Sequence, residues 1–500
     1  MSGPNVAFIR PELSPLLPQY ELIRDCIAGE TTVKEKRELY LPKPEAADKS
    51  VENAERYKAY LKRAVFYNVA RRTHSGMIGQ IFQRPPVEKV PDFMKHVMDN
   101  ATGSGVPFAQ VAKKACGLVL AYSRAGMFVD YPTLPEGQTA SKLDLDTGRI
   151  RPTVTIYSPM EIINWRVIEK GADEVLSLVV LCETYVHADD GFEIKNAGQF
   201  RILKLDENGE YVQELWREPT PATISEGQRP GRGNWMVAET LRPKGPDGSP
   251  LKEIPFRFIG SENNDANPDN PIFYDLCSLN LAHYRNSADY EESCFMVGQP
   301  TPVVTGLTTE WLNKELKGKI NVGSRGGIPL PKGADFKLVA ATESTMLKEA
   351  MEAKERQMTA LGAKLVEQKS VQRTAFESKV DAAREGSVLS TVATNVSQTC
   401  EWALKFCAML MNKPTEDLKY QLNTDFDLSK MTPEDRKQTI AEWEAGAISW
   451  DEMRNRLRAA GTATEDDAKA KSDIERDQVV QMALTPPINQ PGASAFGNRA

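Results

Sequence analysis

The feature that most constrains this chain is a pair of helical segments that brackets a small insert rich in Gly and Pro. Asp269-Asn-Pro271 opens the first segment, and apolar residues recur from there to about 293. The second segment begins near Ser344 with the same helical spacing. The insert between them carries an expected strand at 302–305, a short helix at 308–317 and the glycine-rich run 323–327. This helix–insert–helix order predicts a structural subunit of a larger assembly.

Residues 1–270 divide into a helical part and a strand-rich part. Helical periodicity and breaker residues predict helices over 18–28, 51–83 (with a break near 73–75) and 106–124. From about 150 to 260, β-branched and aromatic runs alternate with turn residues, and the expected strands span 153–157, 176–186, 200–205, 211–218 and 254–259. Asn208-Gly209 is typical of a hairpin turn, and 219–250 is expected to be a long loop.

The C-terminal third is expected to be mostly helical. A polar stretch at 367–374 precedes a long helix from about 377 to 412, and a strand is expected at 418–426. Two further helices begin at Thr432-Pro433 and at Ser449, where Glu452 completes a capping box. Residues 462–500 carry few large apolar side chains, which predicts disorder. The expected fold class is therefore α+β and predominantly helical.

Composition narrows the class of protein. A net charge of −7 argues against a protein that binds nucleic acid freely, although it does not exclude one that lets DNA pass. No apolar run of about 18 residues exists, and the N-terminus lacks a signal-peptide pattern, so we expect a chain made and kept in a cytoplasm, with no membrane contact. The seven cysteines show no CxxC spacing, which indicates buried free thiols.

Motifs for catalysis or metal binding are missing from the sequence. The four histidines have no metal-ligand spacing, and neither a GxxxxGK[ST] loop nor a GxSxG elbow occurs. The acidic turn 265–269 is expected to cap the helix that follows it, and His283 is expected to be a hydrogen-bonded packing residue. Glu291-Glu292 is expected to face solvent. We therefore predict no enzyme activity, no cofactor and no metal site.

Several short motifs, taken in their order along the chain, resemble those of one family. The N-terminal motifs are Asp25-Cys26 with Gly29, Tyr40-Leu-Pro42, Arg71-Arg-Thr73, Arg84-Pro-Pro86, Phe128-Val-Asp-Tyr-Pro132 and Tyr157-Ser-Pro159 with Asn164-Trp165. The later motifs are Ile254-Pro-Phe256, Asn280-Leu-Ala-His-Tyr-Arg285, Ala288-Asp-Tyr290 and Gly298-Gln-Pro300. Over residues 15–430 the chain resembles the portal proteins of tailed bacteriophages, and in particular a portal-like family of phage structural proteins.

The resemblance implies a portal fold with wing, stem, clip and crown parts. The segments it implies are an N-terminal wing at 1–270, stem helix 1 at 271–293, a clip at 294–342, stem helix 2 at 343–365, a tunnel loop at 366–378, the wing's long helix and strand at 379–427, crown helices at 428–461, and a tail at 462–500.

The resemblance also implies a function. Portal subunits form a ring of about twelve copies (a dodecamer) at one capsid vertex, and a ring requires each subunit to present two different complementary faces. The implied role is a conduit for DNA packaging and ejection. The implied partners are other copies of the chain, the terminase, the major capsid or scaffolding protein, the head–tail adaptor, and double-stranded DNA that passes without sequence specificity. The implied locations are the virion and, during assembly, the host cytoplasm.

Four cations at or near the implied tunnel loop are candidate DNA contacts: Lys364, Lys369, Arg373 and Lys379. They would touch phosphates transiently as DNA slides through the channel. The alternative is that they pair with carboxylates of the same segment, such as Glu367 and Glu377.

Two other functions remain open from the sequence. The first is a different virion structural protein, namely a head–tail adaptor or a minor capsid protein. The chain is long for an adaptor, and a capsid protein outside a ring does not need a helix–insert–helix centre. The second is an enzyme whose site cannot be recognised in one sequence.

Overall fold

The computed structural model describes most of the chain, in two compact units that span Met1–Phe426 and Asp427–Ala500. The described residues are 5–132, 148–224, 229–231, 233–299, 301–314, 330–339, 345–362, 375–424, 426, 433–459, 462–463, 467, 469–474 and 476. Helices and antiparallel sheets are both present, so the fold is mixed α+β.

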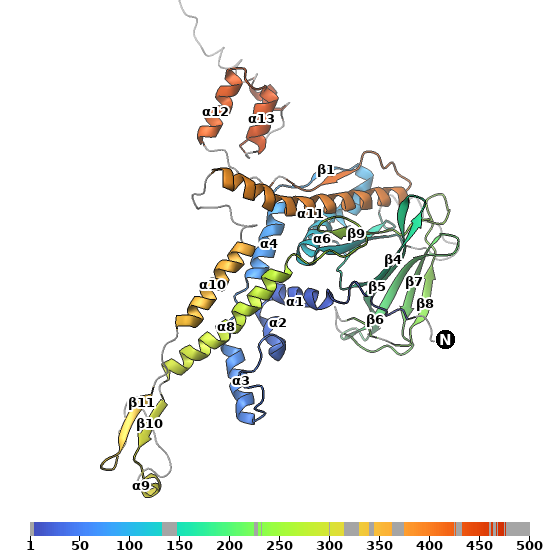
Figure 1. Cartoon of the computed structure of the whole chain (residues 1–500). Helices are drawn as coiled ribbons and strands as arrows, with labels where there is room; N and C mark the ends of the chain where they lie inside the picture. Colours follow the sequence, from blue (N-terminus) through green and yellow to red (C-terminus); the bar gives the residue numbers. More distant parts are fainter. Residues whose placement is uncertain are drawn as a thin grey trace, which may run out of the picture. The chain divides into compact units, whose positions relative to one another are not determined.

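The N-terminal region of the first unit is built of short helices (Figure 1). Their bounds are α1 Leu17–Ala28, α2 Glu30–Glu35, the 3-10 helix η1 Arg37–Leu39, α3 Val51–Arg63, α4 Val69–Ile81, η2 Asp92–Met94 and α5 Lys95–Asp99. The helix expected over 51–83 is interrupted at 64–68. The predicted break near 73–75 is wrong. Thr73 is buried inside α4, and Asn68 begins that helix by accepting a hydrogen bond from Arg71 N.

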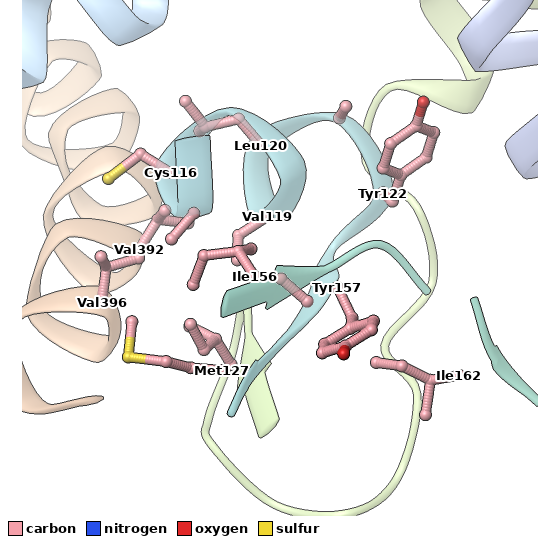
Figure 2. Packing of buried hydrophobic residues seen from close by; sticks show 14 of the residues in the cluster. Cys116, Val119, Leu120, Tyr122, Met127, Ile156, Tyr157, Ile162, Val392 and Val396 are labelled. Carbon is pink, nitrogen blue, oxygen red and sulfur yellow. The ribbon is translucent and has the colours of Figure 1, made fainter. Parts of the chain in front are cut away.

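A helix-on-sheet core occupies the centre of the first unit. Helix α6 (Phe108–Tyr122) packs on a sheet of order β3-β2-β9, whose strands span Thr153–Tyr157, Arg124–Asp130 and Phe256–Gly260. Figure 2 shows Cys116 and Val119 of α6 facing Val392 and Val396 of the long helix α11 (Ala375–Leu410), all of them buried. Gly126 in the central strand leaves room for the ring of Phe256 on the neighbouring strand β9, since a Cβ there would lie 2.3 Å from Cζ of Phe256.

A second, five-stranded antiparallel sheet has the order β4-β5-β6-β7-β8. Its strands span Ile162–Lys170, Asp173–Asp189, Ile194–Leu205, Tyr211–Arg217 and Met236–Leu241. The β6–β7 hairpin turns at Asn208-Gly209, as predicted, and Gly209 has φ of 73°. Strand β8 corrects the expectation of an uninterrupted loop over 219–250, and β4 is a strand that the sequence patterns did not reveal.

The two sheets meet at Trp165 of β4, which is buried and lies in contact with two guanidinium groups. Arg10 lies 4.7 Å and Arg124 lies 4.4 Å from the centre of the indole ring. Arg124 also stacks 4.0 Å from the ring of Phe258, and its Nη2 donates to the carbonyl of Ala266 over 2.9 Å. Burial lowers the pKa of Arg124 to about 10, so the guanidinium stays charged near neutral pH. The Arg124 cation therefore links the two sheets, because it contacts the ring of Trp165 in the five-stranded sheet and the ring of Phe258 in the three-stranded sheet.

The central helix pair forms a segment that we call the arm, defined as α8 through α10. Its elements are α8 Tyr274–Gly298, β10 Thr301–Thr305, α9 Thr309–Lys314, β11 Asp335–Val339 and α10 Thr345–Leu361. Helices α8 and α10 lie side by side, and β10 pairs antiparallel with β11 at their far end (Figure 1). Strand β11 was not expected from the sequence.

After the arm, the chain continues into α11, which packs on α6 and the three-stranded sheet. Its start at Ala375 lies inside the segment 366–378 that was expected to be a loop. The strand that follows is shorter than expected: β12 covers only Lys419–Gln421, where it pairs with β1 (Val87–Lys89).

The second unit contains α12 (Pro433–Glu444) and α13 (Trp450–Ala459). The predicted capping box is confirmed: Glu452 N donates to Ser449 Oγ over 3.1 Å, and Ser449 N donates to Glu452 Oε2 over 2.9 Å. Residues 469–474 are helical, which corrects the expectation of disorder for this piece of the tail. Lys471 lies 4.3 Å from the ring of Trp450, so this piece is held to α13.

Candidate functional site

The candidate site is the arm root, which we define as Cys277–Glu292 of α8 with the N-terminal residues that these side chains contact. Two buried polar residues of α8 bind the backbone of the extended segment 64–68. Asn280 Nδ2 donates to Tyr67 O over 2.8 Å, and its Oδ1 accepts from Ala70 N over 3.2 Å. Ser287 Oγ lies 3.1 Å from Val65 N and 2.7 Å from Val65 O. The two side chains satisfy backbone groups that burial would otherwise leave unpaired.

Further along α8, charged and phenolic groups tie the arm to α3. Tyr60 donates to Asp289 over 2.6 Å, and Glu292 pairs with Arg63 and, over 3.6 Å, with Arg56. Burial, together with the hydrogen bond to Asp289, raises the pKa of Tyr60, so the hydroxyl remains a donor. The side chain of Glu292 is only 16% exposed, which corrects the expectation that it faces solvent.

The root also contacts α1 and Tyr40, the residue that follows η1. Arg285 Nε donates to Tyr40 O over 2.9 Å, and the Tyr40 hydroxyl donates to the buried Asp25 over 2.7 Å. Cys26 Sγ lies 3.8 Å from the carbonyl of Cys277. The motifs Asp25-Cys26, Tyr40-Leu-Pro42 and Asn280–Arg285, far apart in sequence, thus meet at one place.

The root also joins the two helices of the arm to each other. His283 is buried, and its Nε2 lies 3.2 Å from Glu355 Oε1 on α10, which confirms that it is a hydrogen-bonded packing residue. Gly362, just after α10, allows the chain to approach α8 closely, because a Cβ there would lie 2.9 Å from Cδ2 of Leu276. Among the residues of α10, Met358 is the one that is fully buried.

The acidic turn before α8 acts differently from the prediction. Asp269 Oδ2 accepts from Ser261 Oγ over 3.1 Å and from Glu262 N over 3.0 Å, so it folds the turn back onto the end of β9. The first residue of α8 follows Phe273, which provides no side-chain cap. The expectation that this turn caps the helix is wrong, because Asp269 binds the preceding residues and Asp265 accepts from Asn267 within the turn.

The four cations predicted to contact DNA are not placed by the structure. Lys364, Lys369 and Arg373 lie outside the described residues, and Lys379 belongs to α11 in a stretch whose side chains are also outside them. Sequence reasoning missed Asn280 and Ser287 as the residues that hold the arm. Their signal was two polar residues seven apart on an otherwise apolar helix face.

Three general findings complete the site. Six cysteines are buried and Cys294 is exposed, and all seven are free. Within the described ranges, no cluster of three or more His, Cys, Asp or Glu is arranged to hold a metal ion. None of the helices in those ranges is long and apolar enough to cross a membrane.

Comparisons with known proteins give one family model and one solved structure to report. The family model is described as a domain of unknown function (DUF4055), and it matches residues 272–411. No curated protein matches the chain. A solved structure titled as the neck of an empty GTA particle, computed with C6 symmetry, contains a similar chain. The identity is 12% and the TM-score 0.41, over 78% of this chain and 90% of that chain.

Proposed function

We propose that this chain is the portal subunit of a tailed bacteriophage, which assembles into a ring of about twelve copies at one capsid vertex. The ring would serve as the conduit for DNA during packaging and ejection. It would also dock the terminase and, later, the head–tail connector proteins. The observation that carries the proposal is the arm, in which two long helices and a hairpin are followed by the long helix α11.

The exposed apolar residues of α10 support the proposal that the chain assembles with copies of itself. Of its seventeen residues Met358 alone is fully buried, while Met346 is 70% and Leu361 is 53% exposed. On α8, Phe295 and Met296 are 41% and 50% exposed. Helix α8 is buried along its first half, whereas α10 and the end of α8 bury little within the chain and would gain stability from neighbouring copies that cover their apolar side chains.

The contacts of the arm root also support the proposed ring. Buried hydrogen bonds and ion pairs join α8 to α1, α3 and the segment 64–68. In a ring, such a junction would hold each arm in one orientation, so that every copy offers the same two faces to its neighbours. The residues matched by the family model, 272–411, begin just before the arm and end with α11.

The proposal assigns no catalytic step to this chain. The terminase would supply the energy for packaging, and the capsid or scaffolding protein would surround the ring. Lys364, Lys369, Arg373 and Lys379 would contact phosphates weakly enough to let DNA slide.

Locating the chain in the particle tests the proposal. An epitope tag would be placed after Ala500 and labelled with gold-coupled antibody in partly opened particles. The proposal expects label at a single vertex, at the junction of head and tail, inside the shell. Label spread over the whole capsid would favour a minor capsid protein, and label that stays with detached tails would favour an adaptor.

Reversing the charges of the candidate DNA contacts tests the conduit itself. We expect Lys369→Glu with Arg373→Glu to reduce packaged DNA while rings still assemble, because repulsion replaces weak attraction near the phosphates. Packaged DNA is measured as nuclease-protected genome per particle. The control is Lys348→Glu with Lys354→Glu on α10, which makes the same charge change outside the loop. An unchanged yield from the loop variant would contradict the phosphate role.

A further inference from the structure

The β5–β6 hairpin extends beyond the sheet that carries it. Strand β4 pairs with β5 only up to Leu181, and β7 pairs with β6 only from Phe200 onward. All residues of the tip, 186–195, are exposed. Among them, Phe192 is 101% exposed, Ile194 is 56% and Val186 is 55% exposed. A fully exposed phenylalanine gains nothing from the fold of its own chain.

The tip is held in one conformation by its own carboxylates. Asp189 Oδ1 accepts from Gly191 N over 2.8 Å, and Asp190 Oδ1 accepts from Phe192 N over 2.9 Å and from Glu193 N over 2.6 Å. Val186 pairs with Asn196, so Val186 and Ile194 lie on one face of the hairpin. The result is a rigid aromatic anchor surrounded by acidic groups, and rigidity lowers the entropic cost of binding.

The charges at the tip indicate what it binds. The tip carries three carboxylates and one cation, Lys195. The carboxylates are those of Asp189, Asp190 and Glu193. This balance repels DNA and anionic membranes, and it fits a protein surface that is apolar at its centre and basic at its rim.

The same chain carries a surface of that kind on the segment 62–72. Val65 is 48% and Tyr67 is 51% exposed, and the exposed Lys62 and Arg72 lie on either side of them in sequence. No Asp or Glu occurs between Glu55 and Glu88. Hydrogen bonds from α8 hold its central residues, 64–68, in an extended conformation between α3 and α4. Two carboxylates close to this surface are already bonded: Glu292 pairs with Arg63, and Glu355 bonds His283, whose ring lies next to Tyr67.

We propose that the hairpin tip, residues 186–195, docks on the segment 62–72 of a second copy of this chain. Phe192 contacts Val65 and Tyr67, and the carboxylates of the tip face Lys62 and Arg72. The two surfaces differ from each other, so the contact is head-to-tail and can propagate around a ring. This inference rests on the proposed ring and names the surfaces that meet in it.

Photo-crosslinking of the full-length chain tests the contact directly. Benzoylphenylalanine replaces Phe192, and isotope-labelled chain is mixed with unlabelled chain so that crosslinks between copies can be recognised by mass spectrometry. We expect crosslinks between copies at residues 62–72. Crosslinks confined to other segments, or to the same copy, would overturn the proposal.

Two substitutions separate this contact from general loss of folding. Phe192→Asp removes no packing within the chain, and we expect it to raise the concentration needed for assembly by about tenfold or more, as for loss of an interface anchor. Glu193→Arg should weaken assembly as well, and Arg72→Glu in the same chain should restore it. The matched control is Ile168→Asp, at an exposed apolar residue near the β4–β5 turn.

The outcomes distinguish this inference from the proposed function. If rings form equally well with Phe192→Asp, and crosslinks map elsewhere, the contact is wrong and the ring stands. If the wild-type chain does not form rings, the proposed function is wrong. Crosslinks at 62–72 between weakly associating copies would then still support the contact.

Discussion

At the scale of residues, two buried polar side chains of α8 decide how the N-terminal helices meet the arm. Asn280 and Ser287 each bind backbone groups of the segment 64–68. They lie one heptad apart, close to two full helical turns, so both face the same extended segment. The segment itself contains no Gly or Pro. Apart from the local cap that Asn68 provides for α4, its break from helix depends on partners more than 200 residues away along the chain.

Replacing Asn280 tests this account of the root. Asn280→Ala leaves Ala70 N without its acceptor and removes one of the two donors to Tyr67 O, which still accepts from Val69 N; a buried unpaired group costs about 1–3 kcal/mol, and the lost second bond adds to it. We expect the free energy of unfolding to fall by at least about 2 kcal/mol, measured by denaturant titration. The control is Asn286→Ala on the same helix, at a half-buried position, with a much smaller expected loss. Equal effects from the two variants would contradict the proposed role.

At the scale of elements, the stability of α10 depends on very few buried contacts. Met358 is fully buried, while the other apolar residues of this helix are partly or largely exposed. Helix α6, in contrast, buries most of its length between the three-stranded sheet and α11. In a single copy of the chain, α10 should therefore open at a lower free energy than the core helices.

Shortening Met358 tests this difference. We expect Met358→Ala to cost about 2–5 kcal/mol locally, because it removes the fully buried side chain between α10 and α8. Amide hydrogen exchange over 345–361 should accelerate in the unassembled chain, while exchange in α6 stays unchanged. Met346→Ala, at a residue that is 70% exposed, is the control. Uniform acceleration across all helices would show that α10 is not a separate unit.

Sequence reasoning succeeded for elements whose local signals are strong and failed where distant partners decide. The helix periodicity of α8 and α10, the Asn208-Gly209 turn and the Ser449–Glu452 capping box act within a few residues, and all were predictable. Strand β8 exposes nearly every residue, so it has no alternation of buried and exposed positions. Its strand conformation depends on pairing with β7. The arm root was recognisable only as scattered motifs, because hydrogen bonds across about 200 residues join them.

At the scale of the whole molecule, the proposed ring would explain features that one copy leaves unexplained. Exposed apolar residues lie on the arm, on the hairpin tip and on the segment 62–72. Scattered single apolar residues need no explanation, whereas these occur in groups on three surfaces of the first unit. A closed ring would cover them while leaving a central channel, and it uses one contact repeated around an axis.

The measurement that tests the central claim most directly is the mass and shape of the purified full-length chain. Mass photometry gives the copy number, and negative-stain electron microscopy of the same sample shows whether a central hole is present. The account predicts a ring of about twelve copies around a hole. A chain that remains a stable monomer across micromolar concentrations, or that forms compact oligomers without a hole, would contradict it.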